Sequence, residues 1–94
     1  MALETLPFDA AHYLTNAKAQ AELLTDALET GDAGYIANAL GTIVRTRGMA
    51  QVARDAGVTR ASLYKALSAE GDPQLTTLLG VVRALGIKLT AQPI

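Results

Sequence analysis

Apolar residues recur at the three- and four-residue spacing of α-helices along most of this 94-residue chain. Asn16 is a candidate N-cap for a first long helix, which Gly31 ends. Asp32 can cap a second long helix, and Gly48 suits the position after its last turn. The apolar stripes of these two helices are Ala17, Ala21, Leu24 and Leu28 in the first, and Ile36, Ala39, Leu40, Ile43 and Val44 in the second.

The most regular stretch is GMAQVARDAGVTRASLYKAL, which runs from Gly48 to Leu67. It predicts two short helices joined at Gly57, because glycine adopts the left-handed conformation of a sharp turn at little cost. Ala53 is small enough for the two helices to approach closely, and Thr59 is a good N-cap for the second. The shared interior is predicted to hold Val52, Ala56, Val58, Leu63 and Ala66. This combination is typical of a helix-turn-helix.

After this stretch, the sequence EGDP predicts a loop in which Asp72 can cap a last helix and Pro73 suits its first position. That helix ends at Gly86, and its apolar residues are Leu75, Leu78, Leu79, Val82 and Leu85. The tail IKLTAQPI alternates apolar and polar residues, which is a strand pattern. Because one strand cannot form a sheet alone, the tail either lies over the core or pairs with the tail of a second copy.

These elements predict an all-α fold in a single domain, since 94 residues suit one small core. Residues 1–31 are predicted to form an N-terminal helical extension, which includes a short helix from Asp9, as its cap, through Leu14. Residues 32–86 form the helix-turn-helix core, and residues 87–94 form a short extended or strand tail.

The composition excludes several functional classes. The chain has no cysteine and a single histidine, His12, so neither a disulfide framework nor a cysteine or histidine metal cluster is expected. No constellation of a nucleophile and carboxylates surrounds His12, and no phosphate-binding loop is present, so we predict neither an enzyme nor a cofactor. No apolar run approaches the roughly 18 residues of a membrane span, and MALETLPFDA lacks the basic region of a secretory signal. The expectation is a cytoplasmic protein.

The net charge of −1 conceals an asymmetry between the two halves of the chain. Residues 1–44 carry one base and six acids, a net charge of −5, whereas residues 45–94 carry seven bases and three acids, a net charge of +4. Five of the seven bases lie between Arg45 and Lys65, over the predicted helix-turn-helix. This concentration favours a nucleic-acid surface, although solvated helix faces also produce charge asymmetry.

The second short helix is predicted to enter the major groove of DNA with its outward residues near the base edges. Arg60 can pair with guanine through two hydrogen bonds, and Ala61 can touch a thymine methyl group. Lys65 can reach a guanine or a phosphate, and Tyr64 can reach a phosphate or a sugar. The candidates for phosphate contacts around the first helix, which position a protein without reading sequence, are Arg47, Gln51 and Arg54.

Several of these side chains also have a purely structural interpretation. Tyr64 can cover the edge of the core, and Ser62 can bond back to its own helix. Arg54 can pair locally with Asp55. A helical hairpin that serves as an interaction module and does not bind DNA therefore fits the same core pattern.

Residues 48–89, GMAQVARDAGVTRASLYKALSAEGDPQLTTLLGVVRALGIKL, resemble the addiction module antidote proteins. These are small, phage-repressor-like helix-turn-helix proteins that are often encoded beside a toxin. LPFDAAHYL, ALETGDAGYIANALG and VRTRGM also look like that family, so the resemblance covers nearly the whole chain. The most specific feature is LYKALS followed by EGDP. The resemblance implies a lambda-repressor-like fold with an N-terminal helical extension.

The resemblance also implies a role and partners. The role is an antitoxin that neutralises a small toxin, a ribosome-dependent messenger RNA nuclease of the RelE-like group, and represses its own operon by binding double-stranded operator DNA. The helix-turn-helix motif itself leads us to expect a homodimer, because palindromic sites pair with two-fold proteins. Phage repressors often hold a phosphate-contacting glutamine where this chain has Met49; Gln51 lies two residues on and is a weaker candidate than Arg60. The alternative is a stand-alone prophage regulator without a toxin. The positions for which the resemblance implies DNA contacts are Thr59, Arg60, Ala61, Ser62, Tyr64 and Lys65.

Overall fold

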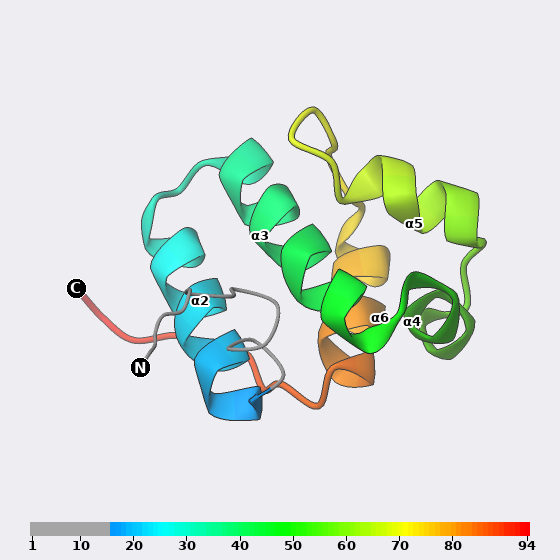
Figure 1. Cartoon of the computed structure of the whole chain (residues 1–94). Coiled ribbons are helices and arrows are strands. Elements are labelled where there is room, and N and C mark those ends of the chain that lie inside the picture. Colours follow the sequence, from blue (N-terminus) through cyan, green and yellow to red (C-terminus); the bar gives the residue numbers. More distant parts are fainter. Residues whose placement is uncertain (1–15) are drawn as a thin grey trace, which may run out of the picture.

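A computed structural model of the chain describes residues 16–94. Five α-helices follow one another within these residues (Figure 1). They are α2 (Ala17–Glu29), α3 (Ala33–Arg47), α4 (Met49–Ala56), α5 (Arg60–Ala66) and α6 (Leu75–Ala84). The prediction of an all-α fold is therefore confirmed. The short helix predicted from Asp9 through Leu14 lies outside the described residues.

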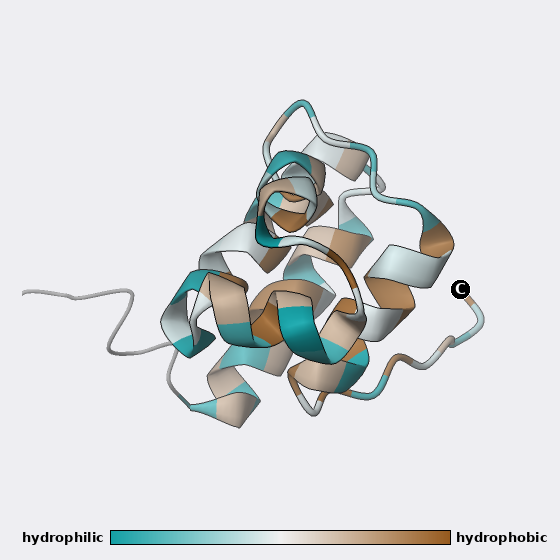
Figure 2. Ribbon diagram, turned by 90° about the vertical axis from the view of Figure 1, so that its right-hand side faces the viewer, coloured by the Kyte–Doolittle hydropathy of each residue, from teal (hydrophilic) through white to brown (hydrophobic). Residues whose placement is uncertain are grey.

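The helices pack in a series of contacts around one core. α2 packs on α3, α3 on α4, and α4 on both α5 and α6. Hydrophobic and hydrophilic residues alternate along the ribbons in Figure 2, as amphipathic helices require. α2 and α5 lie at opposite ends of the molecule in Figure 1, with α3 and α6 between them. The core consists of Leu24, Leu40, Ile43, Val44, Val52, Ala53, Leu63, Leu67, Val81, Val82 and Leu85.

Side-chain caps begin the two long helices where the sequence predicts them. The Asn16 side-chain oxygen accepts hydrogen bonds from the backbone N–H groups of Lys18 and Ala19, at 2.7 and 3.3 Å. The Asp32 carboxylate accepts one from the N–H of Tyr35 at 3.1 Å. These bonds satisfy amide groups that the first turn of a helix leaves without an intrahelical partner, so the ends are set locally.

The turn between α4 and α5 forms at Gly57, whose φ of 76° lies in the left-handed region. The N–H of Val58 donates to the Ala53 carbonyl at 3.0 Å, and the N–H of Gly57 donates to the Arg54 carbonyl at 3.2 Å. This pair of bonds is a Schellman motif, which ends a helix and redirects the chain within two residues. The predicted pair of short helices joined at Gly57 is therefore present.

The start of α6 differs from the prediction. Gln74 is the N-cap and Leu75 is the first helical residue, so the predicted cap at Asp72 and the predicted first position at Pro73 are both wrong. The N–H of Gly71 donates at 2.8 Å to the carbonyl three residues earlier. This bond closes a turn inside the loop, and residues 71–74 after it are not helical. The local cap signal was therefore two residues too early.

The C-terminal tail is extended, and residues 87–94 contain no strand. Ile87 packs against the core. The tail then runs beside α2, where Ile87 and Leu89 line a shallow groove of about 340 Å³ together with Leu24 and Leu28. Of the two forms predicted for the tail, extended or strand, the single chain has the extended one, and it lies over the body of the same chain.

Candidate nucleic-acid interface

The outer side of α5 faces solvent because its inner side is held by the core. Leu63 is 0% exposed and belongs to the core cluster. Gly41 of α3 comes so close to the end of α5 that a Cβ at this position would lie 2.6 Å from the Leu67 carbonyl oxygen. The absence of a side chain therefore lets α3 hold the end of α5 directly. The exposed residues of the helix are Arg60, Ala61, Ser62, Tyr64 and Lys65.

Thr59 begins α5 in the way the sequence predicts. Its side-chain oxygen accepts a hydrogen bond from the N–H of Ser62 at 3.0 Å. Tyr64 is 65% exposed, so the predicted alternative in which it covers the core does not describe it. Six of the nine candidate DNA contacts therefore lie exposed on one segment, residues 59–65, in which Leu63 is the buried residue.

On the exposed side of α4, three polar side chains bond one another. Nε2 of Gln51 donates to the two carboxylate oxygens of Asp55, at 3.0 and 3.1 Å. Nη2 of Arg54 donates to Oε1 of Gln51 at 2.7 Å. Arg54 therefore reaches Asp55 through Gln51, and the amide of Gln51 is already engaged on both sides.

Arg47 extends toward α2 and α6. Its Nη2 donates to the Leu85 carbonyl at 2.8 Å and lies 3.5 Å from Oε1 of Gln20. Because Leu85 is the C-cap of α6, the first bond satisfies a carbonyl that the helix leaves open. Gln20 is buried, and its Nε2 donates to the hydroxyl of Thr46 at 3.4 Å. These bonds tie three helices together, and they do not bring Arg47 to α5.

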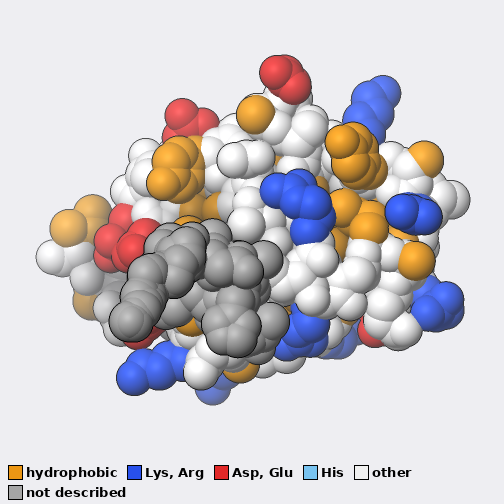
Figure 3. Space-filling model, viewed as in Figure 1, with side chains coloured by type: hydrophobic (Ala, Val, Ile, Leu, Met, Phe, Trp, Pro, Cys, Tyr) orange, Lys and Arg blue, Asp and Glu red, His pale blue; other side chains and the backbone are white. Residues whose placement is uncertain are grey.

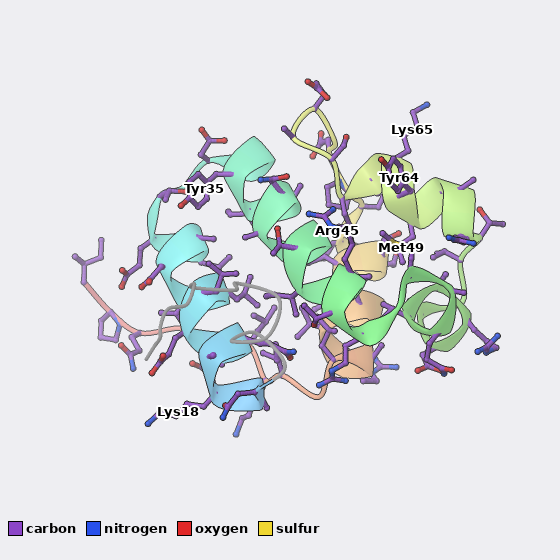
Figure 4. The ribbon with its side chains drawn as sticks, in the orientation of Figure 1. Lys18, Tyr35, Arg45, Met49, Tyr64 and Lys65 are labelled. Atoms are coloured by element: carbon purple, nitrogen blue, oxygen red, sulfur yellow. The ribbon has the colours of Figure 1, made fainter. Side chains whose placement is uncertain are left out.

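Arg45 lies beside α5 instead. It is exposed, and its Nη2 donates to the Thr42 hydroxyl at 3.2 Å. Together with Met49 and Tyr64 it lines a cavity of about 160 Å³ between α3, the start of α4 and α5. In Figure 4, Arg45 and Met49 lie between α3 and α5, and Tyr64 lies on the bordering part of α5. From the sequence, Arg45 is a member of the basic cluster and is not among the predicted DNA contacts.

The charge asymmetry of the sequence is also an asymmetry in space. In Figure 3, Lys and Arg side chains lie mostly on the half of the molecule that holds α4 and α5. Most of the visible Asp and Glu side chains lie at the other end, around α2 and the start of α3. Lys18, labelled in the same orientation in Figure 4, is a base at the acidic end.

Within residues 16–94, no three His, Cys, Asp or Glu side chains gather in a way that could hold a metal ion. None of the helices in that range is long and apolar enough to cross a membrane.

Comparison with known proteins identifies the family of this chain. Residues 4–93 match the model of a family described as "Probable addiction module antidote protein". The chain belongs to this antidote family. The resemblance of the sequence motifs to the addiction module antidote proteins is therefore confirmed.

A relative of this antidote protein occurs in Haemophilus influenzae, where it is described only as "Uncharacterized protein". The two are 41% identical over 85 residues, which cover 90% of this chain and 88% of the relative. No solved structure matches the chain. Membership of an antidote family implies a toxin as the partner, and it suggests a regulatory protein that does not catalyse a reaction.

Proposed function

We propose that this antidote protein binds operator DNA through α5, neutralises a small RelE-like toxin and represses its own operon. The observation that supports DNA binding is the division of α5 into a buried side at Leu63 and an exposed side with Arg60, Ala61, Tyr64 and Lys65. A helix divided in this way can enter a major groove without uncovering the core. The surrounding half of the molecule is the basic half, which suits the charge of DNA.

In this proposal, Arg60 pairs with guanine through two hydrogen bonds and Ala61 contacts a thymine methyl group. Tyr64 and Lys65 contact the sugar-phosphate backbone, which positions α5 in the groove. The protein is proposed to act in the cytoplasm. It is also proposed to bind DNA as a homodimer, because the palindromic sites of helix-turn-helix proteins pair with two-fold symmetric dimers. The remaining proposed contacts are Thr59, Ser62, Gln51 and Arg47. Arg47 has guanidinium donors besides those of Nη2, whereas Gln51 would have to exchange its bonds to Asp55 for a phosphate.

The toxin is proposed to dock on the side of the molecule opposite to α5. A nuclease that acts on messenger RNA needs a basic surface to hold its substrate. Glu22, Asp26 and Glu29 are exposed on α2, which lies at the opposite end of the molecule from α5 (Figure 1). The charge of α2 therefore suits a basic partner, and its position leaves α5 free for DNA.

DNA binding is tested by an electrophoretic shift of the full chain on the DNA upstream of its own gene. We expect a shift at low salt that unlabelled upstream DNA removes at lower concentration than unrelated DNA of the same length. The absence of a shift would contradict DNA binding and favour a helical interaction module. Equal competition by both duplexes would contradict sequence specificity.

Toxin neutralisation is tested by expression of the reading frame adjacent to the antidote gene. We expect this frame to arrest growth when it is expressed alone, and growth to recover when the antidote protein is expressed with it. Continued arrest would contradict neutralisation. An adjacent frame without any effect on growth would favour the alternative, a stand-alone prophage regulator.

A further inference from the structure

Two arginines stand two residues apart at the end of α3, and their side chains take different directions. Two residues this far apart in an α-helix are separated by about 200° around its axis, so their side chains leave the helix in nearly opposite directions. Arg47 donates to the Leu85 carbonyl of α6 at 2.8 Å. Arg45 makes one side-chain bond, to Thr42 within its own helix, and borders Tyr64 of α5. Only Arg45 therefore lies next to the proposed DNA-binding helix.

The cavity that Arg45 lines has the chemistry of an anion site. Among the described residues, its lining includes no Asp or Glu. Arg45 supplies a guanidinium whose flat, forked donors suit phosphate oxygens. The other polar side chains of the lining are Asn38, Tyr64 and Ser68. Asn38 and Tyr64 can donate a hydrogen bond to an anion, whereas the Ser68 hydroxyl already donates to the Lys65 carbonyl at 3.0 Å.

The hollow on the other side of α5 is different. It is lined by Ser62 and Lys65 of the helix, and also by Glu70 and Asp72 of the loop that follows. The two carboxylates oppose the attraction that Lys65 exerts on a phosphate on this side. The lining on the flank of Arg45 has no such carboxylates, so this flank is the better place for a further phosphate contact.

We propose that Arg45 contacts a backbone phosphate of DNA beside α5, so that the interface extends from α5 onto the last turns of α3. This inference rests on the proposed binding of DNA through α5. A phosphate contact fixes the position of α5 in the groove and carries no sequence information itself. Arg45 therefore adds affinity for every duplex alike, while base reading stays with α5.

The experiment compares two variants of the full chain that each lose one positive charge, Arg45→Gln and Lys18→Gln. Lys18 is the matched control because it is an exposed base on α2, at the opposite end of the molecule from α5 (Figure 4). Fluorescence anisotropy gives the affinity of each protein for labelled upstream DNA, and for an unrelated duplex, over a series of salt concentrations. Circular dichroism melts confirm that both variants fold.

We expect Arg45→Gln to make the slope of log K against log salt less negative by about 1, the change for one lost phosphate contact. Its affinity should fall by the same factor for both duplexes, and Lys18→Gln should keep the wild-type slope, since distant charges are screened. Arg45→Lys, which keeps the charge, should also keep the slope, so that a change seen with Arg45→Gln is due to the lost charge.

Three outcomes separate this inference from the proposed function. If the wild-type protein binds and Arg45→Gln keeps its slope, the contact by Arg45 is refuted and DNA binding stands. If Arg45→Gln weakens binding to upstream DNA only, Arg45 reads bases and the phosphate assignment is wrong. If the wild-type protein binds neither duplex at low salt, DNA binding itself is refuted together with the contact.

Discussion

Replacement of Leu63 with alanine is expected to lower the free energy of unfolding by about 2–5 kcal/mol, the usual cost of a buried leucine. Leu63 is 0% exposed and is the buried residue that holds α5 against the core. The substitution removes buried apolar surface and leaves a cavity that the helices around it fill only partly. Because α5 has only seven residues, loss of this contact also loosens the helix that carries the proposed DNA contacts.

The matched control is Leu75→Ala, which makes the same chemical change at a leucine that is 67% exposed. Exposed substitutions of this kind usually change stability by no more than about 0.5 kcal/mol. Urea unfolding of the wild-type protein and both variants is monitored by circular dichroism. The shift of each variant's unfolding midpoint from the wild-type midpoint gives its loss of unfolding free energy. Equal losses for Leu63→Ala and Leu75→Ala would show that Leu63 does not hold α5 in the way its burial indicates.

Replacement of Arg60 with alanine is expected to reduce the preference for upstream DNA over unrelated DNA by about 5- to 150-fold. This range corresponds to about 1–3 kcal/mol, the discrimination that one bidentate contact to guanine supplies. Arg60 is the first residue of α5 and is exposed, and the N-terminal part of such a helix lies nearest the base edges. The measurement is the ratio of the two dissociation constants at one salt concentration.

Lys65→Ala distinguishes base reading from a general loss of charge. Lys65 is exposed on the last turn of α5 and is proposed to contact a phosphate. Its replacement should lower the affinity for both duplexes evenly and should make the salt slope less negative by about 1. If Arg60→Ala gave the same even loss as Lys65→Ala, Arg60 would be a backbone contact and another residue would read the operator.

Much of the helical architecture was predictable because the helix ends depend on short-range chemistry. Asn16, Asp32 and Thr59 each accept a hydrogen bond from an N–H two or three residues further along the chain. At the turn, the N–H of Gly57 donates to the carbonyl three residues earlier, and the N–H of Val58 donates to the carbonyl five residues earlier. Such signals are contained in the sequence itself, so they need no knowledge of the tertiary structure.

The errors fall where distant parts of the chain decide the outcome. The alternating tail IKLTAQPI has a strand period, but a strand needs a partner strand, and the described residues of the chain offer none. Leu75 and Leu79 belong to the apolar stripe predicted for α6, yet both are exposed. Periodicity places residues on one face of a helix, and only the packing of the other helices decides how much of that face is covered.

Apart from the start of α6, the described helices were predictable from the sequence, as were the turn at Gly57, the buried Leu63 and the family of the chain. Arg45 and Arg47 are identical in type and two residues apart, and the sequence favoured Arg47 as the candidate phosphate contact. The tertiary structure separated them, because the packing of α6 against α4 brings the Leu85 carbonyl to Arg47, and the placement of α5 brings Tyr64 to Arg45. Local chemistry sets where a helix begins and ends, whereas the neighbours of its side chains depend on how the helices are assembled.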